Sequence, residues 1–464
     1  MRSNCLWVGG GRVVFPDRVE ENGSVLVRDG KIAAVNVPCP GDAERVLLGD
    51  GVLLPGFVDL HVHGGGGADF TDAEEGCVRV AAQTHLRHGT TAMTPTTMTC
   101  PDALLEKSIL HYLKETAAGF EGPELLGLHL EGPFFATAGK SKGAQPVSEP
   151  RVPTREALEK FIRLADGKIV RWDEAPELPN TDIFAAVMRE NGVLPAIAHT
   201  DAMAPEAYRA FEMGFTHVTH FLSATNWSRK QNARTYGGLN EAVLLRDDIT
   251  VELIADGAHI PKELFQLIYK IKGPGRIALI TDAMRAAGTD ATESILGSKQ
   301  GGVPVVIKYG VAQLPDLSFF AGSIGTMDRA LRFAHLTCGV PLNEASMMLS
   351  ATPARIAGCF HRKGTLTPGK DADLTIMDSG LHVQAVFVRG KRFSGLQGRP
   401  RSLAFFIIRS FFHHSSIKKG GPRHEHSRVL QNQARGTGQE RPHPPSDSGG
   451  QQGADVRIRP ANAF

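Results

Sequence analysis

Two histidines separated by one residue are the first sign of chemistry in the sequence. His61 and His63 close the largely apolar run 54–60. Because alternate residues of a strand share one face, both imidazoles can point toward the same ion. Histidine nitrogens are favoured ligands of divalent transition metals. The pattern therefore predicts a metal site at the end of a strand.

Three further ligand-type side chains stand where later apolar runs end. Glu131 is followed by Gly132-Pro133, which stops a strand and fixes the loop after it. His199 and His220 each close another apolar run. Two nitrogens and one carboxylate leave room for a water molecule, which is typical of a catalytic metal rather than a structural one. We expect Glu131, His199 and His220 to form such a set.

A fifth apolar run ends in an acid that could move protons. Asp282 follows the run 276–280, and a carboxylate beside a metal-bound water can take its proton and pass it to a leaving amine. His129 and His217 lie within the same kind of run. We expect these two histidines to be core residues, or to support the ligands, rather than to bind the metal.

The elements that must position these residues form a repeating pattern. Strand-like apolar runs alternate with helical stretches, which favours a parallel sheet covered by helices. Eight such runs predict a closed (β/α)₈ barrel of the TIM type, whose chemistry lies at the carboxyl ends of the strands. The predicted strands are 56–61, 92–96, 125–130, 168–172, 194–198, 217–221, 250–254 and 276–280.

Both ends of the chain differ from this pattern. Short β-branched runs near each end predict a small β-sandwich module built from residues 1–54 and 365–393, with the barrel between them at 55–364. Residues 394–464 are rich in Arg, Gly, Pro, Gln, Ser and His and lack periodicity. This composition predicts a disordered tail.

The bulk properties exclude several classes of protein. A chain of 464 residues is long enough for a barrel and a module, and its net charge of +2 gives no reason to expect nucleic acid as a partner. Its apolar runs are too short to cross a membrane. Six scattered cysteines without a CxxC pair favour a reducing compartment. These features predict a cytoplasmic protein with neither nucleic-acid nor membrane partners.

The motifs resemble those of the N-acetylglucosamine-6-phosphate deacetylase family of the amidohydrolase superfamily. The likeness extends from about residue 5 to about residue 393, and its most specific stretches are 55–64 (PGFVDLHVHG), 129–134 (HLEGPF), 255–259 (ADGAH) and 281–284 (TDAM). The resemblance implies a metal-dependent hydrolase that removes the acetyl group from an N-acetylated amino-sugar 6-phosphate, foremost N-acetylglucosamine 6-phosphate. The products would be acetate and the amino-sugar phosphate.

The resemblance also implies roles for single residues. Glu131, His199 and His220 would hold the principal metal, His61 and His63 would belong to a second one, and Asp282 would be the general base and acid. The cofactor would be one or two divalent ions, zinc or iron, and the protein a homodimer. The implied substrate-binding residues are Ala144, Gln145, Ser223, Ala224, His259, Ala321 and Gly322.

The sequence departs from the family at three places near the substrate. Gln145 stands where a histidine often polarises the substrate carbonyl, and residues 223–225 (SAT) replace Asn-Ala-Met. The family's phosphate-binding arginine, which is followed by Glu-Pro-Gly, has no counterpart in the segment 226–238. Its candidate replacements are Arg229, Lys230 and Arg234. These changes leave deacetylation standing and leave the exact sugar phosphate open.

Three other interpretations of the motifs remain at this stage. A hydrolase of cyclic amides would share the barrel and the two histidines, but such enzymes generally use a carboxylated lysine at the end of the fourth strand. Here Lys168 stands at the start of that strand. A non-catalytic barrel that serves as a scaffold would be expected to lose ligand residues. A deacetylase of a different N-acetyl sugar is a closer alternative.

Overall fold

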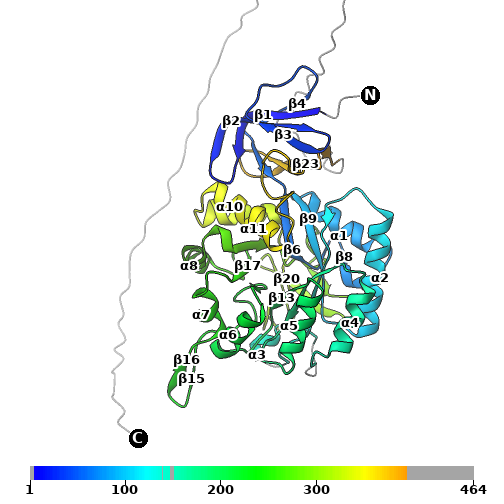
Figure 1. Ribbon diagram of the computed structural model, residues 1–464, viewed down its shortest axis with the longest axis vertical. Coiled ribbons are helices and arrows are strands. Elements are labelled where there is room, and N and C mark those ends of the chain that lie inside the picture. The colour runs from blue at the N-terminus through cyan, green and yellow to red at the C-terminus, as the bar shows by residue number, and fades with distance from the viewer. Residues whose placement is uncertain (1–4, 138, 147–150, 394–464) are drawn as a thin grey trace, which may run out of the picture. The chain divides into compact units, whose positions relative to one another are not determined.

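The computed structural model of the chain describes residues 5–137, 139–146 and 151–393 (Figure 1). The tail predicted for 394–464 lies outside the described residues. Within the described part, no helix combines the length and the apolar character that a membrane span requires.

Eight parallel strands form the sheet of a barrel, and this confirms the predicted fold. Neighbours in the sheet are also neighbours along the chain. The seam between the first and last strands is closed by the Asp282 amide, which donates to the His61 carbonyl at 2.9 Å, and by a parallel bridge between Val62 and Ala283. The strands are β6 (Phe57–Val62), β9 (Thr90–Thr97), β11 (Leu128–Phe134), β12 (Ile169–Glu174), β13 (Leu194–Ile197), β14 (His217–Val218), β17 (Thr250–Ile254) and β18 (Ile277–Ile280).

Helices surround these strands (Figure 1). Two successive helices turn aromatic side chains toward the sheet: Phe161 and Phe184 contact Trp172 of β12, with ring centroids 6.2 and 6.0 Å from that of Trp172. Burying such aromatic side chains is a large part of what holds a helix on a sheet. The helices are α1 (Cys77–Leu86), α2 (Asp102–Ala118), α3 (Gly139–Lys142), α4 (Arg155–Leu164), α5 (Thr181–Glu190), α6 (Ala204–Met213), α7 (Leu239–Leu244), α8 (Lys262–Lys272), α9 (Met327–Arg332), α10 (Leu342–Leu349) and α11 (Ala351–Ile356).

The two ends of the described chain meet in a second, eight-stranded sheet with its own apolar core. Most of its pairs are antiparallel. The strand β1 differs, because it runs parallel to β4 in its first half and to β5 in its second. Its antiparallel pairing with β2 has an irregular register between Gly9 and Val13. The strands are β1 (Cys5–Val14), β2 (Val19–Arg28), β3 (Lys31–Val35), β4 (Glu44–Leu47), β5 (Val52–Pro55), β22 (Leu374–Met377), β23 (Val383–Val388) and β24 (Lys391–Arg392).

One residue joins this sheet to the barrel. Gly56 lies between β5 and β6, and its amide donates to the Asp373 carbonyl at 2.8 Å. A Cβ at this position would come within 2.1 Å of the Thr91 hydroxyl. Only glycine therefore fits where the chain passes from one sheet into the next.

The barrel carries short elements that the sequence pattern did not predict. An exposed hairpin of β15 (Arg229–Gln231) and β16 (Arg234–Tyr236) projects from the barrel (Figure 1). A three-stranded sheet follows the last barrel strand, formed by β19 (Glu293–Leu296), β20 (Val303–Lys308) and β21 (Val311–Gln313). The remaining elements are β7 (Gly64–Gly65), β8 (Ala68–Asp69), β10 (Glu124–Leu125), the 3₁₀ turns Phe70–Asp72 and Pro274–Arg276, and the π-helical turn Phe333–Thr337.

Candidate metal centre and active site

The ligand-type side chains predicted from the sequence converge at the carboxyl ends of the barrel strands. His199, His220 and Asp282 each stand two residues beyond the last residue of a strand. Their φ angles are +45°, +30° and +46°, which is a region that residues other than glycine rarely adopt. The same unusual backbone conformation therefore recurs where three of these side chains leave the sheet.

Glu131, His199 and His220 form one compact group. Oε1 of Glu131 lies 2.8 Å from Nε2 of His220 and 3.1 Å from Nε2 of His199, and these two nitrogens are 3.1 Å apart. All three residues are buried. Two imidazole nitrogens and a carboxylate oxygen thus face one small volume, as the sequence predicted.

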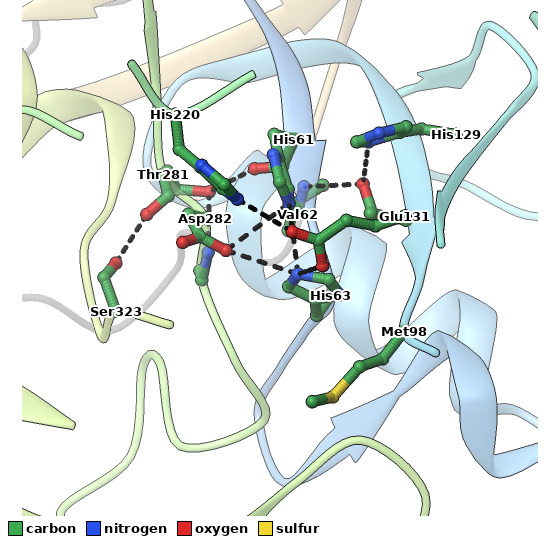
Figure 2. Close-up of polar contacts among 12 residues, drawn as sticks. His61, Val62, His63, Met98, His129, Glu131, His220, Thr281, Asp282 and Ser323 are labelled. Carbon is green, nitrogen blue, oxygen red and sulfur yellow. Dashed lines mark hydrogen bonds and ion pairs between the residues drawn. The ribbon is translucent and has the colours of Figure 1, made fainter. Parts of the chain in front are cut away.

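His61, His63 and Asp282 form a second group beside the first. The Nε2 atoms of the two histidines are 3.1 Å apart, and Oδ1 of Asp282 lies 3.5 Å from His61 and 3.3 Å from His63. Glu131 connects the groups, because its Oε2 lies 3.3 Å from Nε2 of His63 (Figure 2).

The donor sets of these groups fit divalent cations. In each group two imidazole nitrogens face one another at 3.1 Å. Two nitrogen lone pairs that face each other repel, and a cation bound between them removes this repulsion. Burial would lower the pKa of His63, but its contacts with Asp282 and Glu131 outweigh burial and raise that pKa well above its ordinary value. The buried carboxylates therefore draw positive charge to this point, as metal sites do.

A network of buried charges lies beneath the ligands, and the sequence analysis did not assign it. The carboxylate of Glu252 pairs with the guanidinium of Arg171. Burial would raise the pKa of Glu252, but Arg171 and two histidines hold it well below its usual value. Asp173 lies 2.8 Å from His129 on the other side of Arg171. The signal was present, since β12 and β17 carry charged residues within otherwise apolar runs.

His129 and His217 belong to this network and to neither ligand group. Nδ1 of His129 lies 2.7 Å from Arg171 and 3.1 Å from the Thr96 hydroxyl. Nε2 of His217 lies 3.0 Å from Arg171. Their positions agree with the expectation that both histidines support the ligands from the barrel interior.

A cavity of about 280 Å³ opens above the two groups. The predicted metal ligands, the predicted general base and the implied substrate-binding residues all line it, except His61 and Ala321, which are fully buried. The Ala321 amide donates to Ala312 at 3.0 Å, so this residue supports the wall behind Gly322. Those that line the cavity are His63, Glu131, Ala144, Gln145, His199, His220, Ser223, Ala224, His259, Asp282 and Gly322.

Two predicted residues in the wall have polar contacts that define their orientation. Nε2 of Gln145 donates to Oε2 of Glu131 at 2.7 Å, so this amide bonds directly to the carboxylate that connects the two groups. His259 bonds through Nδ1 to Asp256 at 2.7 Å and packs on Phe320, with ring centroids 4.5 Å apart.

The structure also shows what the sequence analysis missed in the cavity. Lys140 of α3 lines it, whereas Arg229, Lys230 and Arg234 lie on the exposed β15–β16 hairpin and do not. The role of those three as a phosphate grip stays a prediction. Apolar walls come from Met98 and from residues around the unpredicted three-stranded sheet, namely Leu296, Phe319 and Phe320.

Comparison with known proteins agrees with this fold. The model of the amidohydrolase family matches residues 52–393, which is most of the chain. The chain therefore belongs to the amidohydrolase family, whose members are metal-dependent hydrolases of carbon–nitrogen bonds.

Particular relatives narrow the assignment. The N-acetylglucosamine-6-phosphate deacetylase of Bacillus subtilis is 32% identical over 385 residues, which cover 82% of this chain and 94% of that protein. The human protein of the same name is 30% identical, with coverage of 83% and 90%. A mutant of the Mycobacterium smegmatis enzyme, solved in complex with N-acetyl-D-glucosamine-6-phosphate, superposes with a TM-score of 0.76 at 28% identity, covering 84% of this chain and 99% of that one. Within the amidohydrolases, the chain belongs to the N-acetylglucosamine-6-phosphate deacetylase family, which confirms the resemblance seen in the motifs.

Proposed function

We propose that this protein hydrolyses the acetamide bond of N-acetylglucosamine 6-phosphate and releases acetate and glucosamine 6-phosphate. The observation behind the proposal is the convergence of Glu131, His199, His220 and Asp282 within one cavity at the mouth of the barrel. The names of the relatives, and the sugar phosphate bound in one of their structures, support the choice of substrate.

The first group would hold the principal divalent ion and the second group a further one, with zinc or iron as the metal. Such an ion, when bound, supplies a Lewis acid and lowers the pKa of water. Glu131 would serve both positions, since one oxygen faces His199 and His220 and the other faces His63.

Asp282 would transfer the proton that the reaction requires. It lines the cavity and takes the proton of the attacking water, a carbon–oxygen bond forms at the acetyl carbon, and the carbon–nitrogen bond breaks as Asp282 returns the proton to the amine. Gln145 uses one amide N–H on Glu131, so its second N–H remains available to the acetyl oxygen.

The sugar phosphate would lie between the ligand groups and the nitrogen-bearing side chains of the wall. His259 and Lys140 both line the cavity and would hold the phosphate. Ser223, Ala224, Ala144 and the backbone at Gly322 would contact the sugar, as the resemblance implies.

The competing functions fit the site less well. The carboxyl end of β12 is formed by Asp173 and Glu174 and offers no lysine for carboxylation, which weighs against a cyclic-amide hydrolase. A scaffold barrel would have no need to keep two buried groups of ligand-type residues. The predicted homodimer, the cytoplasmic location and the domain limits at 54/55 and 364/365 stay predictions.

A direct test compares the wild type with Asp282→Asn. We expect the wild type to release acetate from N-acetylglucosamine 6-phosphate, and the variant to lose about 10²–10⁴-fold in kcat, because an amide cannot accept the proton. The principal metal, measured by inductively coupled plasma mass spectrometry, should be retained on Glu131, His199 and His220. Near-normal turnover by the variant would refute the role of Asp282, and a wild type without acetate release would refute the function.

A further inference from the structure

Glu252 is a fully buried carboxylate in the middle of β17, directly beneath the two ligand groups. Its Oε2 lies 3.3 Å from Nδ1 of His61 and 3.3 Å from the backbone nitrogen of His220. One oxygen thus contacts one residue of each group. His61 presents its side chain to this oxygen, and His220 presents its main chain.

The other oxygen of Glu252 is held from below. Oε1 pairs with Arg171 and lies 3.3 Å from Nε2 of His217. Arg171 is fixed in turn, because it also donates to the Leu60 carbonyl at 3.0 Å. Because all of these contacts lie inside the barrel, the carboxylate cannot shift without breaking several of them. Each broken contact would leave a buried polar group without a partner, which costs free energy.

This arrangement determines how His61 can act. Nδ1 must carry the proton in order to donate to Glu252, so Nε2 keeps its lone pair and faces His63 and Asp282. The bond to the His220 amide acts on a residue whose φ is +30°, and therefore helps to hold a main-chain conformation that is unfavourable on its own.

We propose that Glu252 is a positioning residue that orients two metal ligands at once, the imidazole of His61 and the main chain of His220. The inference rests on the proposed function, because it takes both histidines as ligands. Partners that fix the free ring nitrogen of a ligand histidine typically change metal affinity 10- to 100-fold when they are replaced.

Glu252→Gln tests the proposal with almost no change of shape. A glutamine has one acceptor end and one donor end, but Glu252 is met by donors at both of its oxygens, His61 and the His220 amide at one and Arg171 at the other. In either orientation of the glutamine amide, its NH₂ group points at another hydrogen-bond donor, either Arg171 or the His61 and His220 nitrogens. We expect the dissociation constant for Zn²⁺, measured by competition with a chromophoric chelator on metal-free protein, to rise 10- to 100-fold.

Asp173→Asn is the matched control. Asp173 is equally buried, lies 3.7 Å from Arg171 and bonds to His129, but it contacts neither ligand histidine. We expect its Zn²⁺ affinity to stay within about 3-fold of the wild type. The visible absorption of the Co²⁺-loaded proteins gives an independent readout, because it reports ligand geometry and should change for Glu252→Gln alone.

Glu252→Asp decides the matter if Glu252→Gln does not fold, as judged by circular dichroism. This variant keeps the charge opposite Arg171 but is one methylene shorter, so it should lose the contact with His61 and show the same loss of affinity. Wild-type affinity in both folded Glu252 variants, or an equal loss in Asp173→Asn, would overturn the proposal. Since metal binding is measured without turnover, failure of the proposed substrate would show separately, as a wild type that binds Zn²⁺ normally and releases no acetate.

Discussion

Lys140 is the one side chain with a fixed positive charge among the described residues that line the cavity. A phosphate in a partly enclosed cavity needs such a partner. An anion that leaves water loses hydration free energy, and contacts with neutral groups do not offset this loss. At the residue scale, the preference for a phosphorylated sugar should therefore depend on this lysine.

Lys140→Ala should raise KM for N-acetylglucosamine 6-phosphate about 10-fold, the effect of losing one charge-assisted bond. Its KM for unphosphorylated N-acetylglucosamine should not change. Lys142→Ala, in the same short helix but outside the cavity lining, should behave as wild type with both sugars. Steady-state kinetics with the two sugars would show this, and an equal effect of Lys140→Ala on both would contradict a phosphate contact.

The sequence revealed the ligand residues because each stands at the end of an apolar run, where a barrel places its chemistry. It did not reveal Arg171 or Glu252. A charge inside a strand becomes interpretable only when its partner is known, and that partner lies 81 residues away on another strand. Lys140 was missed for a similar reason, since nothing local shows that a short helix borders the cavity.

At the scale of elements, a buried ion pair ties the loop after β18 to the first 3₁₀ turn. Arg285 meets Asp72 through two bonds of 3.0 and 2.7 Å, and the Asp72 side chain is fully buried. Arg285 also donates to the carbonyls of Ile295, near the carboxyl end of the strand β19, and of Gly297, directly after that strand. The pair therefore attaches the three-stranded sheet, and with it part of the cavity wall, to the barrel.

Asp72→Asn should lower the free energy of unfolding by about 3–5 kcal/mol, because it leaves the Arg285 charge buried without a counter-charge. Glu74→Ala removes the nearby exposed ion pair with Lys299 and should lower the free energy of unfolding by only about 0–1 kcal/mol. Denaturant unfolding of both variants checks the contrast. Equal losses would show that burial does not govern the strength of these pairs.

The barrel strands were predicted more accurately than their ends and insertions. Strand β14 covers only His217–Val218 of the predicted run 217–221, because the chain leaves the sheet at His220 with a positive φ. The β15–β16 hairpin has exposed strands of three residues each, too short for a periodicity to show. Such local pairs follow from turn geometry and loop length rather than from burial.

At the scale of the whole molecule, metal binding and folding should be coupled. Glu131 and Asp282 are buried together with the histidines that face them, and a cation that binds only the folded chain stabilises it by mass action. The repeating strand–helix pattern was enough to predict the barrel that brings them together. The sequence alone could not give their distances, which depend on how the barrel closes.

Removal of metal by dialysis against a chelator should abolish acetate release and lower the unfolding temperature. A free ion at 100 times its dissociation constant contributes about 2.7 kcal/mol, which corresponds to several degrees for a protein of this size. Thermal scans before and after dialysis, and after adding back Zn²⁺ or Fe²⁺, measure the effect. Full activity and an unchanged unfolding temperature in metal-free protein would contradict a metal-dependent enzyme.

The pairing of β5 with β22, in which Leu374 lies opposite Pro55, joins the segment that enters the barrel to the one that leaves it. In terms of chain entropy, this pairing closes a loop around the whole barrel, much as a covalent cross-link would. The entropy of closing a loop depends only weakly on its length, so that doubling the loop costs about 0.6 kcal/mol more. Insertions at the rim, such as the three-stranded sheet that helps to shape the cavity, can therefore lengthen the chain between these strands at little expense to the closure itself.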